Sequence, residues 1–254
     1  MLALGVFWSG FVKDLVCLPR PLSPPLQRIT MSGSATLEYG FPSTHSTNAV
    51  SVAAYLIYNL HAGHVEMDTR YQTIALFAGY AYATSIIFGR LYCGMHGFFD
   101  VIIGGALGAI IAALQIAYGL AFDTWITEGS WIRPVTTVLI ILLAVRFHPE
   151  PADNCPCFDD SVAFAGVLLG IELGHRHYAS SGLAWTVPSP ATVPFDLDSL
   201  GWTGTVLRIL GGVVVIFLWR AAMKPLLLRG LPPVFRYIEY TGYSLPRRFF
   251  TKAR

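Results

Sequence analysis

Long apolar runs separated by short polar islands form the main pattern of the chain. A helix needs about 20 apolar residues to cross a bilayer, and most of the runs approach that length. The first run, residues 1–12, is too short to cross, so we expect further membrane spans before it. The pattern predicts an all-α, polytopic membrane bundle with about six to seven membrane segments. Helices are predicted over residues 46–60, 71–88, 98–120, 131–147, 162–173 and 206–223.

The composition supports a membrane protein. Apolar residues make up 54% of the 254 residues and charged residues only 13%, and the mean hydropathy is +0.55. These values lie outside the usual range of soluble domains. The net charge of +2 is too small to indicate nucleic-acid binding. What carries information is the position of the charges, because they gather in the polar islands.

Three of these islands carry groups suited to phosphate chemistry. The first contains Lys13 and Arg20, seven positions apart, and the third begins with Arg90. A phosphate ester spreads negative charge over several oxygens, and arginine can contact two of them at once. Each cation alone could be an interfacial anchor at a helix end, but together they favour a phosphate site. The islands are residues 13–21, 42–45 and 90–100.

The second and third islands supply hydroxyl, imidazole and carboxylate groups. Ser43 or Thr44 can cap the following helix, whose free amides form an anion site. The four-residue spacing of His96 and Asp100 places both side chains on one face if that segment is helical. One imidazole can then attack phosphorus while the carboxylate orients it. A second imidazole, from His45, can donate a proton to the leaving alcohol.

Metal-binding groups also occur in the chain. Cys155 and Cys157 lie close to Asp153, Asp159 and Asp160. The one-residue spacing of the cysteines fits zinc poorly. The loops around the three islands hold no carboxylate cluster of the kind that binds magnesium. We therefore predict no metal and no cofactor, with the fixed cations balancing the phosphate charge.

The three islands resemble the signature motifs of a known family. Lys-x6-Arg-Pro, Pro-Ser-x-His and Arg-x5-His-x3-Asp, in that order, are similar to those of the type 2 phosphatidic acid phosphatase (PAP2) superfamily, which also includes vanadium haloperoxidases. The signature covers residues 13–100, and a weaker likeness reaches about residue 175. The segments 7–8, 17–21, 38–40 and 148–158 most resemble sphingoid long-chain base 1-phosphate phosphatases.

The resemblance implies a helical bundle of that type and a role for each motif residue. His96 would form a phosphohistidine, Asp100 would orient it, and His45 would protonate the leaving group. The sequence departs from the family at Gly89, where a serine is usual, and so lacks one hydroxyl donor. The expected catalytic residues are His96, His45 and Asp100, and the expected phosphate-binding residues are Lys13, Arg20, Ser43, Thr44 and Arg90.

The expected function is hydrolysis of a sphingoid base 1-phosphate, a lipid substrate, by a metal-independent integral membrane enzyme. Broad-specificity lipid phosphate or isoprenoid pyrophosphate hydrolysis is an alternative within the same chemistry. A non-catalytic anion transporter or scaffold is an alternative of another class. We expect residues 1–175 to form the phosphatase core and residues 176–254 to hold a loop, the last span and a basic tail.

Two expectations about topology remain open. Two predicted helices separate the first and third islands, so both lie on one membrane face. The count of later spans places the basic tail on that same face, which the positive-inside tendency assigns to the cytosol. The family resemblance instead implies an endoplasmic reticulum enzyme whose site faces the lumen.

Overall fold

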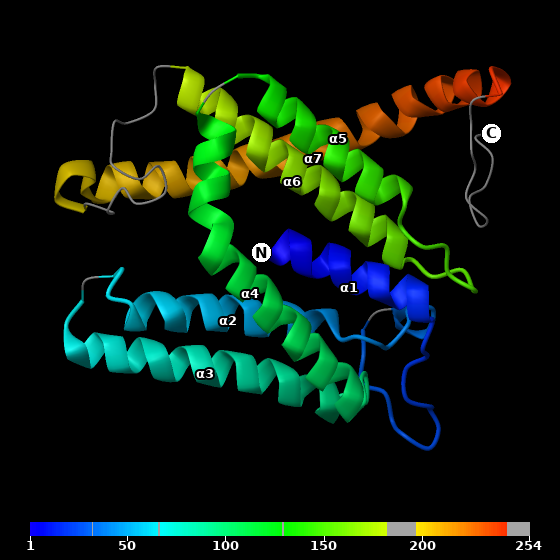
Figure 1. Cartoon of the computed structure of the whole chain (residues 1–254), viewed down its shortest axis with the longest axis horizontal. Coiled ribbons are helices and arrows are strands. Elements are labelled where there is room, and N and C mark those ends of the chain that lie inside the picture. The colour runs from blue at the N-terminus through cyan, green and yellow to red at the C-terminus, as the bar shows by residue number, and fades with distance from the viewer. Residues whose placement is uncertain (32, 66, 129, 182–196, 243–254) are drawn as a thin grey trace. The chain divides into compact units, whose positions relative to one another are not determined.

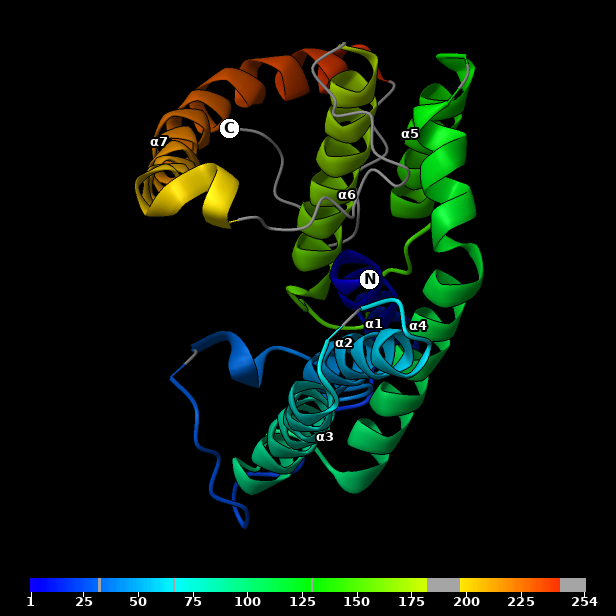
Figure 2. The same ribbon diagram turned by 90° about the vertical axis from the view of Figure 1, so that its left-hand side faces the viewer.

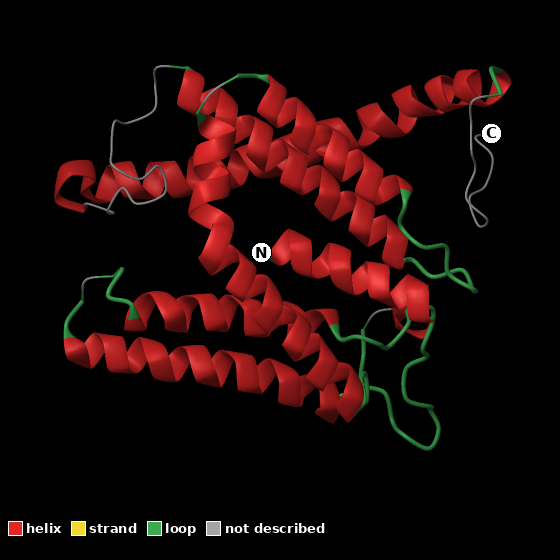
Figure 3. Ribbon diagram, in the orientation of Figure 1, coloured by secondary structure: helices red, strands yellow, loops and turns green. Residues whose placement is uncertain are grey.

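A computed structural model of the chain describes residues 1–31, 33–65, 67–128, 130–181 and 197–242. Every regular element in these ranges is helical (Figure 3), which confirms the all-α prediction. Seven α-helices follow one another along the described residues, with one short 3-10 helix, Gly33–Thr36, in the loop after the first. They are α1 (Leu2–Val16), α2 (Thr44–His61), α3 (Thr69–Tyr92), α4 (Phe98–Thr127), α5 (Ile132–Arg146), α6 (Cys157–Ser180) and α7 (Leu197–Tyr240).

Three described segments are long and apolar enough to cross a bilayer. They are α3, α4 and the part of α7 from Leu200 to Tyr240. The helices α1 and α5 have 15 residues each, fewer than a membrane crossing requires. The chain is therefore an integral membrane protein. Its helices differ in length, and α1 and α5 are too short to cross a bilayer alone.

The chain divides into two compact units. The first, Met1–Ala184, contains α1 to α6, and the second, Trp185–Arg254, contains α7. Within the first unit, α1 lies between α2 and α6 (Figures 1 and 2). Its Phe7 packs with Ile141 of α5 and Ala165 of α6 in a buried apolar cluster. The opening helix is thus at the centre of this unit and carries Lys13 in its last turn.

Helices α2 and α4 pack closely at the end of α2 that carries the second island. Gly104 and Gly108 of α4 face the backbone of Ser43 and Thr47 respectively, so a side chain at either glycine would collide with backbone atoms. Small residues spaced four positions apart in this way allow two helices to approach closely. The contact fixes the start of α2 against the first turns of α4.

Several helices extend beyond their predicted ends. Helix α3 continues to Tyr92, past its predicted end at residue 88, so Arg90 lies on the helix. Helix α6 begins at Cys157, with Asp159 and Asp160 in its first turn, where acidic side chains complement the helix dipole. Helix α7 runs from residue 197 to 240, although its backbone departs from helical angles at Gly201. Residues 182–196, in the loop predicted for the C-terminal part, and the tail beyond residue 242 lie outside the described residues.

Candidate active site

The three polar islands meet at one cavity in the first unit. It has a volume of about 560 Å³ and is lined by residues from α1, the loop that follows it, α2, α3, the loop before α4, and α6. Of the eight predicted site residues, Ser43 and Asp100 do not line it. The predicted residues that do line the cavity are Lys13, Arg20, Thr44, His45, Arg90 and His96.

His96 is buried at the cavity wall, and its two ring nitrogens have different partners. Nδ1 lies 2.9 Å from the Gly40 carbonyl oxygen, which can only accept a hydrogen bond. Nδ1 therefore carries the proton and donates a hydrogen bond to the Gly40 carbonyl oxygen. Nε2 is left with its lone pair and lies 3.2 Å from Nη1 of Arg20, which donates to it. The imidazole is thereby held in the tautomer that presents Nε2 as a nucleophile.

Asp100 lies beside His96, as the four-residue spacing predicted, but its closest contacts are elsewhere. Its Oδ2 is 3.7 Å from Nδ1 of His96 and accepts a hydrogen bond of 2.8 Å from the Gly97 amide. Its own carbonyl accepts the Ser43 amide at 3.0 Å. Asp100 thus caps α4 and joins the second island to the third, and Gly40 is the nearer partner of the imidazole. Sequence reasoning missed Gly40 because a backbone carbonyl has no side-chain signature.

Arg20 is held in a fixed orientation by three groups. Its Nη2 forms an ion pair of 2.8 Å with Oε2 of Glu38, and its Nε donates to the Glu38 carbonyl at 3.2 Å. Nη1 also donates to the Met95 carbonyl at 3.0 Å. A guanidinium fixed in this way is ready to receive phosphate oxygens without first losing side-chain freedom. Glu38 was not among the predicted site residues.

Burial and positive charge keep His96 neutral. Burial, with the charges of Arg20 and Lys13 adding to it, lowers the pKa of His96 to about 3. His45, in the first turn of α2, also has a lowered pKa, first because of burial and then because of Arg90 and Lys13. An arriving phosphate offsets these cations, so it favours a proton on His45. The site can therefore hold a neutral nucleophile and, once phosphate is bound, a proton donor.

The two hydroxyl residues of the second island have different roles. Ser43 is the N-cap of α2, and its Oγ accepts the Ser46 amide at 3.4 Å and the Ser46 hydroxyl at 3.0 Å. Thr44 lines the cavity, and its Oγ1 accepts the hydroxyl of Ser9 from α1 at 2.8 Å. Of the two residues expected to cap the helix, Ser43 is the cap, and Thr44 is the hydroxyl that faces the cavity.

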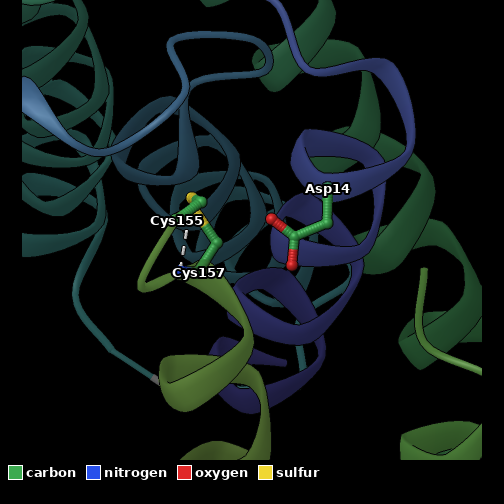
Figure 4. Close-up of side chains that lie close together, drawn as sticks. All are labelled: Asp14, Cys155 and Cys157. Atoms are coloured by element: carbon green, nitrogen blue, oxygen red, sulfur yellow. Dashed lines mark hydrogen bonds between the residues drawn. The ribbon is translucent and has the colours of Figure 1, made fainter. Parts of the chain in front are cut away.

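A buried thiol and carboxylate cluster lies beside the site. Asp14, Cys155 and Cys157 face one another (Figure 4), with their potential metal-ligand atoms within 4.8 Å of one another. The Cys157 amide donates to Sγ of Cys155 at 3.4 Å. Sequence reasoning had grouped these cysteines with aspartates nearby in the chain, whereas the structure brings in Asp14 from α1. Three ligands fall short of the four that structural zinc usually takes.

A buried Asp–His–Ser arrangement adjoins this cluster. Nδ1 of His148 lies 3.6 Å from Oδ2 of Asp14, and its Nε2 lies 3.1 Å from Oγ of Ser161. The order of groups resembles a hydrolase triad. Ser161 is fully buried, however, and its hydroxyl donates to the Cys157 carbonyl. We interpret the arrangement as a polar network that joins α1 to α6.

Comparisons with known proteins agree on one family. Residues 1–123 match the PAP2 superfamily. A dihydrosphingosine 1-phosphate phosphatase of Schizosaccharomyces pombe is 38% identical over 94% of this chain and 56% of its own length. One from Saccharomyces cerevisiae is 36% identical over 87% of this chain and 52% of its own. Sphingosine-1-phosphate phosphatase 2 of Mus musculus is 28% identical over 92% of this chain and 65% of its own.

The chain spans about half the length of the two yeast relatives, 56% and 52% respectively. No solved structure matches it. The matched residues 1–123 include all three polar islands, so the family and the geometry identify the same part of the chain.

Proposed function

We propose, on the premise that residues 1–123 match the PAP2 superfamily, that the chain is a lipid phosphomonoesterase. Its substrates are sphingoid long-chain base 1-phosphates, which it converts to the free base and inorganic phosphate. The observation that carries the proposal is the neutral Nε2 of His96, fixed by Gly40 and facing a cavity lined with cations. The names of the relatives support the choice of lipid.

In the proposed reaction the cations bind the phosphate first. Lys13, Arg20 and Arg90 neutralise the phosphate oxygens, and Thr44 adds a hydroxyl donor. Glu38 keeps the Arg20 side chain in place, and a phosphate oxygen replaces the imidazole as acceptor of the Nη1 hydrogen. The lone pair of His96 Nε2 is then free of the Arg20 hydrogen bond and can attack phosphorus.

The chemical steps use the two imidazoles in turn. Nε2 of His96 forms a bond to phosphorus while the bond from phosphorus to the leaving oxygen breaks, and His45 gives that oxygen its proton. The intermediate is a phosphohistidine. Water then attacks phosphorus, His45 accepts the water's proton, and cleavage of the phosphorus–nitrogen bond restores His96. No step requires a metal, because the three side-chain cations stabilise the developing charge.

The proposal extends to location and domain organisation. We place the enzyme in the endoplasmic reticulum membrane, as the likeness to sphingoid base 1-phosphate phosphatases implies. We assign residues 1–175 to the phosphatase core and residues 176–254 to a C-terminal part. A lipid substrate fits this setting, since its tail can stay among apolar helices while its headgroup enters the cavity.

Phosphate release by membranes that contain the chain tests the proposal. The substrates are dihydrosphingosine 1-phosphate and phosphatidic acid, assayed with EDTA, and the variants are His96→Ala and His61→Ala. His61 is an exposed histidine at the other end of α2 and serves as the matched control. We expect EDTA-resistant release from the sphingoid lipid that His96→Ala abolishes and His61→Ala retains.

Each alternative has its own outcome in this assay. Similar rates on both lipids would favour the broad-specificity lipid phosphatase, a reading supported by a 30% identical relative named lipid phosphate phosphatase delta in Arabidopsis thaliana. A wild-type chain that releases phosphate from neither lipid would refute the proposed function. Release from an isoprenoid pyrophosphate, added as a third substrate, would then favour the pyrophosphate phosphatase, and no release from any of the three would favour an anion transporter or scaffold. Loss of activity in EDTA would contradict the metal-independent reaction.

A further inference from the structure

The cavity that binds phosphate in our proposal also contains two carboxylates. Glu38 and Asp160 line it together with Lys13, Arg20 and Arg90. A carboxylate repels a phosphate group, so its presence in a phosphate cavity needs a reason. Glu38 has one, because its ion pair of 2.8 Å orients Arg20.

Asp160 differs from Glu38 in having no such partner. It lies in the first turn of α6, and its side chain is exposed at the cavity. Across the part of the chain that the structure describes, no hydrogen bond or ion pair involves its carboxylate. Burial raises the pKa of Asp160, the Glu38 charge adds to this, and the Lys13 charge opposes it. Asp160 is therefore within electrostatic reach of the phosphate-binding groups and is open to a ligand.

The proposed substrates contain a group that fits this position. A sphingoid base 1-phosphate carries an amine on the carbon next to the phosphorylated one, and at neutral pH the amine is a cation. Phosphate and ammonium are only a few bonds apart, so a protein that binds both needs an anion beside its phosphate-binding cations. Phosphatidic acid has a phosphate but no ammonium.

We infer that Asp160 binds the substrate ammonium and so selects amino lipid phosphates over other lipid phosphates. This inference rests on the proposed function. With the phosphate held by the Lys13, Arg20 and Arg90 cations, the ammonium lies toward α6 and donates charge-assisted hydrogen bonds to the Asp160 carboxylate. Glu38 adds negative potential on the same side. The lipid tail covers the pair and reduces its contact with water, which strengthens the attraction.

The test compares Asp160→Asn with Asp159→Asn, which removes the same charge one residue away. Asp159 is exposed and does not line the cavity. The substrates are dihydrosphingosine 1-phosphate and its N-acetyl derivative, which keeps the phosphate and tail but has no ammonium. The readout is the ratio of kcat/KM for the amino lipid to that for the N-acetyl lipid.

We expect Asp160→Asn to lower this ratio about tenfold, the loss typical of one hydrogen bond between charged groups. Asp160→Glu should restore most of the ratio, and Asp159→Asn should leave it unchanged. An unchanged ratio in Asp160→Asn, or an equal fall in Asp159→Asn, would overturn the assignment. Because the readout is a ratio, a general loss of folded protein does not imitate the expected result.

Binding to the inactive His96→Ala chain separates this inference from the proposed function. Equilibrium binding of the two lipids is measured in detergent with and without the Asp160→Asn change. We expect the second substitution to weaken binding of the amino lipid only. Equal binding of both lipids in both variants would overturn the role of Asp160. A wild-type chain that binds the amino lipid selectively but releases no phosphate would refute the proposed function and leave the ammonium site supported.

Discussion

The Gly104→Ala substitution tests how the helix packing supports the site. A Cβ at Gly104 would lie 2.6 Å from the Ser43 carbonyl oxygen and 3.2 Å from its nitrogen, whereas ordinary contacts begin at 3.4 Å. The obstructing atoms are backbone, so α2 and α4 must separate by several tenths of an ångström. The hydrogen bond of 3.0 Å from the Ser43 amide to the Asp100 carbonyl would then lengthen.

The expected effect combines three terms. Overpacking of a close contact costs about 1–3 kcal/mol, a weakened buried hydrogen bond costs about 1 kcal/mol more, and the better helix propensity of alanine returns about 1 kcal/mol. We expect Gly104→Ala to lower the free energy of unfolding by about 1–3 kcal/mol. Phosphate release should fall as well, because Thr44 and His45 follow Ser43 directly and line the cavity.

Gly105→Ala is the matched control on the next position of α4. Its Cβ would lie 3.5 Å from Cγ2 of Val50, an ordinary contact with a side chain. Alanine is a better helix former than glycine, so this variant should be neutral or up to about 1 kcal/mol more stable. Thermal unfolding in detergent, followed by tryptophan fluorescence, measures both variants beside phosphate release. Equal stability of the two variants would refute the close packing of α4 on the start of α2.

Two further predictions concern the third island. Asp100→Asn should retain most activity, because the side-chain amide oxygen can still accept the Gly97 amide hydrogen while Gly40 fixes the His96 tautomer. Asp100→Ala should lower the rate of phosphate release about tenfold, because the first turn of α4 loses its cap. Equal and large losses in kcat for both variants would show that the carboxylate charge itself orients the imidazole. The lowered pKa of His96 means that the ring is neutral near neutral pH and becomes charged only as pH falls through about 3. A nitrogen NMR titration of the substrate-free protein, with His96→Gln to assign the signal, should show no protonation of His96 near the usual histidine pKa of about 6.5. Protonation of His96 near that pH would contradict its burial among cations.

The helices were predictable from the sequence, but some of their ends were not. Apolar runs mark the parts of a helix that face lipid or core, so α2 and α5 begin and end close to the predicted positions. Helix α4 begins at the predicted residue 98 but continues to Thr127, past its predicted end at residue 120. Polar residues at a helix end interrupt the apolar run without breaking the helix. This is why α6 begins at Cys157 and not at residue 162, since the two aspartates of its first turn stabilise the helix dipole.

Most residues that line the cavity in the three islands were also predictable, because charged side chains between apolar runs are conspicuous. The partners that fix them were not. Gly40 acts through a backbone carbonyl, which every residue possesses, and Glu38 acts through an ion pair with Arg20. Both lie in the segment 38–40 that resembles the family, but sequence reasoning assigned neither of them a role. Asp160 is remote in the sequence from the three islands and reaches the cavity only because α6 packs against α1. Such partners depend on tertiary packing, which spacing along the chain does not reveal.

The position of α6 suggests how the site divides its tasks. The superfamily match ends at residue 123, and it contains every residue that contacts phosphate in the proposed reaction. Cys157, Asp160 and Phe164 of α6 line the same cavity from beyond that boundary. The buried network of Asp14, His148 and Ser161 holds α6 to the helix that carries Lys13. Residues of α6 line the cavity but take no part in the proposed reaction, so they can change without loss of catalysis. We therefore expect substrate preference to depend on α6 more than on the three islands.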